Sequence, residues 1–143
     1  MQISTDELMK QLNSSNNIED YLSKNEALFN DTSLADYLYN MFDEKCLKKN
    51  KVFAKAEIAE VYGYQILGGK KHPSRNVTLA LCIGAGFTLN ETQVALQIGK
   101  YSSLSPKDKR DSIIIFGINS NQSVVEINLK LYEKKLETLS TSK

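Results

Sequence analysis

Apolar residues recur at helical spacing along most of the chain, which predicts an all-α fold. The clearest stripe follows Ser33, a residue type that suits the N-cap of a helix. Two short helices are then expected over residues 48–56 and 58–67, and Gly68-Gly69 after the second is a strong C-cap signal. The stripe after Ser33 has i, i+3, i+4, i+7 and i+8 spacing and consists of Leu34, Tyr37, Leu38, Met41 and Phe42.

Capping signals predict four more helices after residue 72. Pro73-Ser74 and Ser105-Pro106 each place a proline where a helix can begin, and the second of these helices is expected to run to about Asn119. Two capping boxes precede the other two, which cover residues 89–98 and 124–139. The boxes are Thr88 with Glu91 and Ser123 with Glu126.

Strands are the alternative at two places, because residues 113–118 and Val124-Val125 have high β-propensity. We reject strands there, since the apolar run at 113–118 lies between helix caps and has no partner strand with turn chemistry. Residues 1–32 are expected to hold further helices, with a start at Thr5 and apolar positions at Ile18, Tyr21 and Leu22. The expected total is eight or nine short helices.

Charge is distributed unevenly along the 143 residues, although the net charge is only +1. Residues 1–44 carry nine acids and two lysines, a net −7, whereas residues 45–75 carry eight bases and two acids, a net +6. The remaining residues carry +2. Either the basic segment has an anionic partner, or the blocks arise by chance or pair with each other inside the chain.

The residue types present argue against several functional classes. No apolar run approaches the roughly 20 residues of a membrane span. Two cysteines and one histidine leave no disulfide scaffold and no zinc site, and we expect a cytoplasmic protein without a metal or cofactor. A catalytic Cys–His pair would have to join Cys46 or Cys82 to His72, so we expect no enzyme.

Residues 47–91 resemble the lambda-repressor-type helix-turn-helix domain of bacterial XRE-family regulators. Leu47 precedes the expected second helix, and Val52 and Phe53 supply its apolar positions. The two specific ends of the pattern are the turn Gly69-Lys70-Lys71-His72-Pro73-Ser74 and the corner Gly86-Phe87-Thr88-Leu89-Asn90-Glu91. Residues 33–46 fit the family's first helix.

The resemblance implies a five-helix domain over residues 33–100. Residues 1–32 would then be an acidic helical extension, and residues 101–143 a helical hairpin packed on the domain. It also implies a DNA-binding transcriptional regulator whose recognition helix, about 59–67, enters the major groove. The base-reading candidates are Gln65, Tyr62, Tyr64, Val61 and Glu60, and the phosphate contacts are Lys48, Lys49, Lys70, Lys71 and Arg75.

Two positions depart from the family pattern. Glu57 stands where the family usually has a glycine, because the chain needs a positive φ there. Gly63 stands where an isoleucine or valine is usual, and it is expected to cost about 0.5–1 kcal/mol of helix stability. The alternative function is therefore a protein–protein interaction module that keeps the helix-turn-helix scaffold without reading bases.

Partners other than double-stranded DNA remain open. The apolar helix at 113–118 must be buried, either against the domain or in a homodimer seam. A protein partner could bind the N-terminal extension or the C-terminal hairpin. The acidic start of the chain could also cover the basic segment and regulate it.

Overall fold

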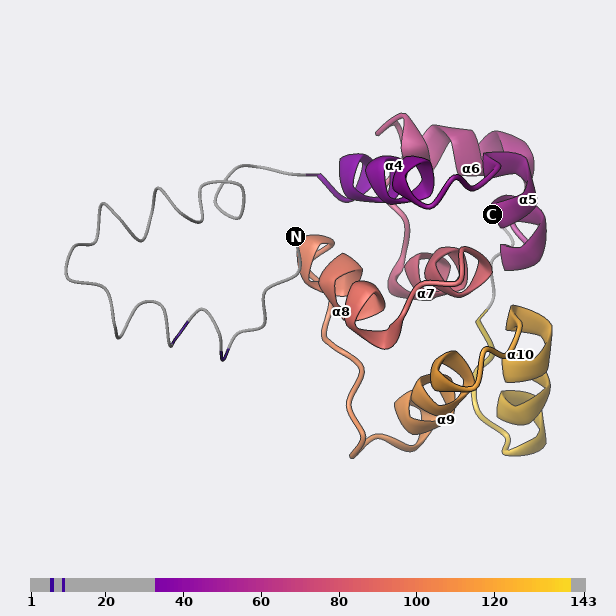
Figure 1. Cartoon of the computed structure of the whole chain (residues 1–143). Helices are drawn as coiled ribbons and strands as arrows, with labels where there is room; N and C mark the ends of the chain where they lie inside the picture. Colours follow the sequence, from indigo (N-terminus) through magenta and orange to yellow (C-terminus); the bar gives the residue numbers. More distant parts are fainter. Residues whose placement is uncertain (1–5, 7–8, 10–32, 140–143) are drawn as a thin grey trace. The chain divides into compact units, whose positions relative to one another are not determined.

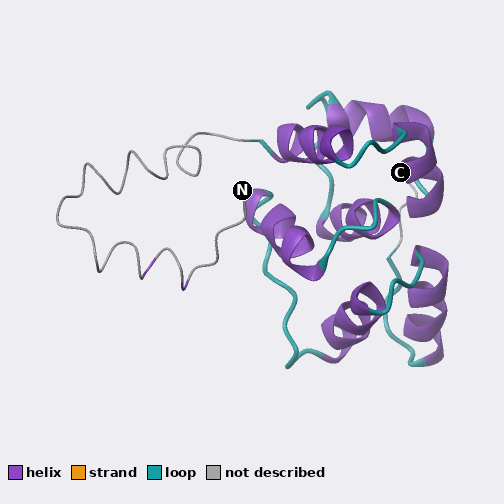
Figure 2. Cartoon of the chain, viewed as in Figure 1, coloured by secondary structure: helices purple, strands orange, loops and turns teal. Residues whose placement is uncertain are grey.

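The computed structural model describes residues 33–139, together with Asp6 and Met9. The chain divides between Thr32 and Ser33 into two units. The helices expected before residue 33 and the chain end at 140–143 lie outside the described residues. Within residues 33–139 every regular element is a helix and there is no strand, which confirms the all-α expectation (Figures 1 and 2).

Seven helices follow one another through short connections in the described part of the chain. None of them is long and apolar enough to cross a membrane. They are α4 (Leu34–Glu44), α5 (Lys49–Ala56), α6 (Glu60–Leu67), α7 (Arg75–Gly84), α8 (Leu89–Ile98), α9 (Lys109–Asn119) and α10 (Val124–Glu133).

The expected N-caps form the expected hydrogen bonds. The Ser33 hydroxyl accepts the Asp36 N–H at 3.0 Å, and the Ser74 hydroxyl accepts the Val77 N–H at 3.2 Å. Both capping boxes are complete, at the start of α8 and at the start of α10. These caps satisfy N–H groups that have no partner inside the helix, so the helix starts follow from local sequence.

The start of α9 differs from the expectation. The helix begins at Lys109 rather than at Pro106, and its N-cap is Asp108, whose carboxylate accepts the Asp111 N–H at 2.8 Å. The Ser105 N–H is instead bound to the Asp111 carboxylate at 3.1 Å. Two aspartates therefore hold the chain in a turn at 105–107, and this delays the helix past the proline.

The end of α10 also differs, since the helix stops at Glu133 and does not reach Leu139. Lys135 adopts a left-handed φ of 61°, which ends the helix. Leu139 is nevertheless buried, and its N–H donates to the Asn128 side chain at 2.7 Å. Residues 136–139 thus contact α10 without being helical.

Helix α7 lies at the centre of the described unit. Its residues from Val77 to Ile83 are all buried, including the polar Thr78, so this stretch is enclosed on every side. It packs against α5 and α8 and also contacts α10, while α9 packs against α8 and α10. In Figure 1, α4, α5 and α6 lie on one side of α7, and the α9–α10 hairpin lies on the other.

The turn between α5 and α6 contains the positive φ that the resemblance to the helix-turn-helix family predicts at position 57. Glu57 adopts φ 60° and ψ 41°, in the left-handed region. The Ile58 N–H then bonds to the Phe53 carbonyl at 2.9 Å, and Ile58 is buried. A glutamate in this conformation costs roughly 1–2 kcal/mol relative to glycine, and the turn is formed despite this cost.

Gly63 is buried in the middle of α6 beneath the side chain of Phe53. A Cβ atom placed on Gly63 would lie 2.6 Å from two carbons of the Phe53 ring. Phe53 is 1% exposed, so its ring is enclosed by other atoms of the protein. The bulky ring on α5 therefore fills the space that a larger residue on α6 would take.

We expect Gly63→Ala to destabilise the fold by about 1–3 kcal/mol, because the new methyl group overlaps the ring. This loss should appear although alanine favours a helix by up to about 1 kcal/mol. Phe53→Leu should remove the overlap, so the double variant should be more stable than the sum of the two single changes predicts. Urea denaturation of the four proteins measures this coupling. A more stable Gly63→Ala variant would contradict the packing described.

The pKa of Glu91 lies below its ordinary value of 4.5. Burial raises this pKa, but two interactions together lower it by more. The Glu91 carboxylate accepts from the Thr88 N–H, and it pairs with the Lys45 ammonium at 3.0 Å. Glu91→Gln should therefore cost about 0.5–1 kcal/mol at neutral pH. Because the folded-state pKa is lowered, the difference from wild type should be complete above 4.5 and vanish as pH falls through the folded-state pKa. Denaturation measured from neutral to acid pH tests this, and an unchanged deficit in acid would refute it.

Candidate nucleic-acid interface

One face of α6 is turned away from the core. Gly63, Ile66 and Leu67 form the buried face, which packs on α4 and α5. On the other side, Val61 is 72% exposed and Tyr64 is 47% exposed. The outer face of α6 is therefore accessible within the described unit.

The five predicted base-reading residues do not all share this face. Glu60, Val61 and Tyr64 are exposed, and Gln65 is half-buried beside them. Their i, i+1, i+4 and i+5 spacing places these four on one side of the helix. Tyr62 lies at the edge of α6 and packs partly on the core. Tyr64 also contacts the Phe53 ring edge-to-face, with 5.1 Å between the centroids.

The basic turn after α6 is attached to the end of that helix. The N–H groups of Lys70 and Lys71 both donate to the Gln65 carbonyl, at 2.9 and 3.2 Å. Gly69 supplies the positive φ, 79°, that this geometry needs. Both lysine side chains are exposed. The turn therefore presents two cations at a set position relative to the outer face of α6.

Tyr101, in the segment before α9, contacts two residues of this turn. The Tyr101 hydroxyl donates to the Pro73 carbonyl, and the His72 ring lies 5.8 Å from the Tyr101 ring between centroids. Burial raises the pKa of Tyr101, and the nearby Tyr62 hydroxyl raises it further. Tyr101 therefore stays a protonated donor, and it connects the turn to the chain that leads into the hairpin.

Arg75 makes intramolecular contacts. Its guanidinium forms two bonds to the buried Asp111 carboxylate, at 3.1 and 3.3 Å. It also donates to the carbonyls of Ser102 and Ser103, at 3.0 and 3.4 Å. With these acceptors the guanidinium of Arg75 is occupied inside the protein.

The two lysines at the start of α5 differ from each other. Lys49 lies 3.4 Å from the Asp43 carboxylate and 4.4 Å from the centroid of the Tyr39 ring. Lys48 is exposed. Of the five predicted phosphate contacts, Lys48, Lys70 and Lys71 therefore have free cationic ends within the described part, whereas Lys49 and Arg75 are paired.

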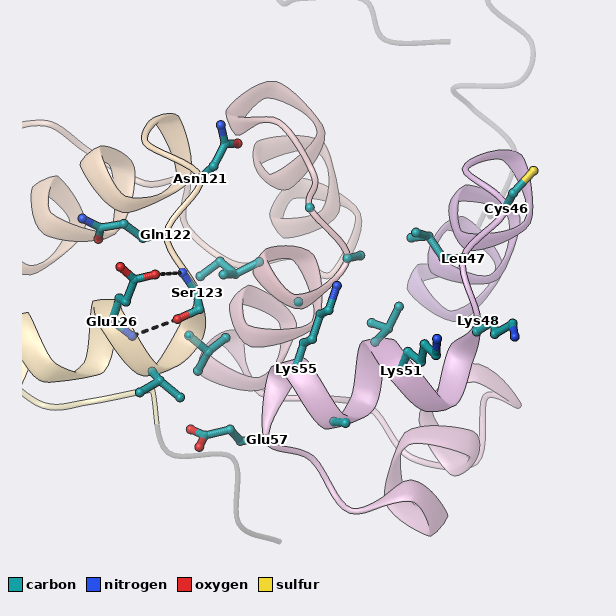
Figure 3. A pocket seen from close by; sticks show the side chains of 18 residues that line it. Cys46, Leu47, Lys48, Lys51, Lys55, Glu57, Asn121, Gln122, Ser123 and Glu126 are labelled. Atoms are coloured by element: carbon teal, nitrogen blue, oxygen red, sulfur yellow. Dashed lines mark hydrogen bonds between the residues drawn. The ribbon is translucent and has the colours of Figure 1, made fainter.

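A row of three lysines, of which the sequence prediction included only Lys48, lies along α5. Lys48, Lys51 and Lys55 line a groove of about 750 Å³ between α5 and the first residues of α10 (Figure 3). None of these three lysines forms an ion pair with another described residue. Their i, i+3 and i+7 spacing was visible in the sequence, and it places them in one row along a helix.

Of the candidate nucleophilic residues, Cys46 lines this groove, whereas Cys82 and His72 do not. Cys82 is fully buried, and burial raises the pKa of its thiol far above the ordinary value although the Thr92 hydroxyl opposes this. Cys46 is exposed, and the His72 ring is tilted by 30° relative to the Tyr101 ring. Among the residues that the structure describes, no group of histidine, cysteine and acidic side chains could hold a metal ion.

Comparison of the chain with protein-family models, with curated proteins and with solved structures finds no match.

We expect Arg75→Met to destabilise the protein by about 2–4 kcal/mol, because the buried Asp111 carboxylate loses its cation. Asp111→Asn in the same background should recover part of this loss, which a double-mutant cycle in urea measures. Lys49→Met serves as the control, since it breaks a more exposed ion pair and should cost less than about 1 kcal/mol. Equal losses from the two cation variants would contradict a special role for Arg75.

Proposed function

We propose that this chain is a DNA-binding transcriptional regulator that inserts α6 into the major groove. In this proposal α5 and α6 are the two members of a lambda-repressor-type helix-turn-helix, and α4, α7 and α8 complete its five helices. The observation that carries the proposal is the accessible outer face of α6, which is followed directly by the exposed cations of Lys70 and Lys71.

The two departures from the family pattern are compatible with this proposal. Glu57 takes the left-handed conformation for which the family uses glycine, so the turn that sets the angle between the helices is present. The Phe53 ring occupies the space above Gly63, so the two helices stay in contact without a larger residue at that position. Both observations support a helix-turn-helix scaffold in which residues other than the usual ones of the family form the turn and the contact between the helices.

The outer face of α6 offers chemistry for reading base pairs. The Gln65 amide can pair with the two hydrogen-bonding groups of adenine in the major groove. The Val61 side chain can contact a thymine methyl group, and the Glu60 carboxylate can accept from a cytosine amino group. Lys48, Lys70 and Lys71 would contact phosphates, which fixes the position of the protein but does not read sequence.

A second candidate function is a protein-interaction module on the same scaffold. The observation that favours it is the composition of the outer face of α6, which carries one carboxylate, at Glu60, and no basic residue. Val61 and Tyr64 are both large, apolar and exposed there. Such a face could bind an apolar protein surface, and no carboxylate would then lie near phosphates.

Binding to a random-sequence duplex at several salt concentrations tests the DNA proposal. We expect affinity to fall steeply with salt, because lysines release counterions from DNA. Lys70→Ala with Lys71→Ala should weaken binding to every duplex and reduce the slope of log affinity against log salt by about 2. The matched control is Lys51→Ala with Lys55→Ala, which removes the same charge from the groove on α5 and should have a smaller effect.

Selection of bound duplexes from a random library tests base reading in the same proteins. Gln65→Ala should relax the preference at one position of the selected sequence and leave the salt dependence unchanged. Absence of a salt slope in wild type would exclude DNA binding and leave the interaction module. A salt slope without any selected sequence would exclude base reading by α6.

A further inference from the structure

The middle of the basic turn, residues 69–74, depends on a hydrogen bond from outside the turn. The start of the turn is bound to α6, because the N–H groups of its two lysines donate to the Gln65 carbonyl, and its end is fixed at Ser74, which caps α7. Between these ends, Pro73 has no N–H to donate. No backbone–backbone bond among the described residues involves Pro73 or the residue before it. The bond from the Tyr101 hydroxyl to the Pro73 carbonyl therefore fixes this part of the turn.

Tyr101 is itself held in place by its neighbours. Its backbone N–H donates to the Leu96 carbonyl at 2.8 Å, directly after α8. A Cβ atom at Gly99 would lie 3.1 Å from a carbon of the Tyr101 ring, so the glycine leaves space for the ring. The carbonyl of the next residue, Ser102, accepts from Arg75 at 3.0 Å. The donor is therefore fixed relative to α8 and to the start of α7.

The turn and the segment after α8 are joined by hydrogen bonds in both directions. Tyr101 donates to Pro73, and Arg75, two residues after Pro73, donates to two carbonyls of that segment. The His72 ring also lies beside the Tyr101 ring, with 5.8 Å between the centroids. Because Arg75 fixes the start of α7 by separate bonds, loss of the tyrosine hydroxyl should free residues 72 and 73 and leave the helices in place.

We propose that Tyr101 is a positioning residue, whose hydroxyl holds the basic turn in the shape in which Lys70 and Lys71 reach DNA phosphates. This inference rests on the proposed function, in which the two lysines contact phosphates while α6 lies in the major groove. A turn that is already ordered in the free protein loses less conformational freedom on binding, and affinity gains by that difference. Both lysines are exposed and lie within three residues of Pro73, so displacement of Pro73 shifts their backbone directly.

Tyr101→Phe removes the hydroxyl and keeps the ring. We expect it to weaken binding to a random-sequence duplex by about 3- to 10-fold, the ordinary contribution of one hydrogen bond. The slope of log affinity against log salt should also become smaller, because lysines that are less well placed release fewer counterions. In a protein that already carries Lys70→Ala and Lys71→Ala, the same change should have almost no further effect on affinity.

The matched control is Tyr37→Phe. The Tyr37 hydroxyl also donates to a backbone carbonyl, that of Glu91 at 3.0 Å, but this bond joins α4 to α8. Tyr37→Phe should leave the DNA affinity and the salt slope unchanged, and urea denaturation compares the loss of stability in the two variants. A purely structural role for Tyr101 would lower affinity by the same factor with and without the two lysines, and would leave the salt slope unchanged.

NMR relaxation of the backbone N–H groups of Lys71 and His72 tests the turn in the free protein, without DNA. In Tyr101→Phe their order parameters should fall from the ~0.85 of a rigid backbone, and they should stay unchanged in Tyr37→Phe. An equally ordered turn in Tyr101→Phe would overturn this inference and leave the proposed function standing. So would an equal loss of affinity in the protein without the two lysines. A wild type with no salt-dependent binding would overturn the proposed function, and the role of Tyr101 in phosphate contact with it.

Discussion

The contact between the Phe53 ring and the bare backbone of Gly63 sets how closely α6 approaches α5. The ring is buried and lies where a side chain of α6 would otherwise be, so the two helices can approach only because position 63 has no Cβ. The outward direction of Val61 and Gln65, and the place of the lysine turn that follows, depend on this approach. A glycine on α6 thus lies against a large ring on α5, at the position where the family pattern usually has an isoleucine or valine on α6.

Much of the fold follows from local sequence, because helix starts are determined by residues close together. Ser33, Thr88 and Ser123 cap helices as expected, since the N–H groups they accept lie three residues further on. The expected start of α9 at Pro106 was wrong because Ser105 is bound to Asp111, six residues away, and this contact competes with the proline signal. Leu139 packs on the hairpin without being helical, which no periodicity could show.

The candidate site was predictable only in part. The positions of Glu60, Val61 and Gln65 on one face follow from helical spacing alone. The ion pair of Arg75 does not follow from helical spacing, because its carboxylate partner Asp111 is 36 residues away in the sequence. The row of Lys48, Lys51 and Lys55 follows from helical spacing, although the family pattern marks only Lys48 among them. Contacts between segments that are distant in the sequence therefore determine which cations form ion pairs within the described residues and which remain available to a partner.

The contacts of Arg75 have a consequence for how the chain can be divided. The arginine begins α7, yet every acceptor of its guanidinium, at Ser102, Ser103 and Asp111, comes after residue 100. A fragment that ended where the helix-turn-helix pattern ends would keep a cation without its acceptors, and Tyr101 would no longer hold Pro73. Helices α4 to α8 and the α9–α10 hairpin are therefore joined by the contacts of one arginine, and we expect the segment from residue 33 to residue 139 to fold as a single unit.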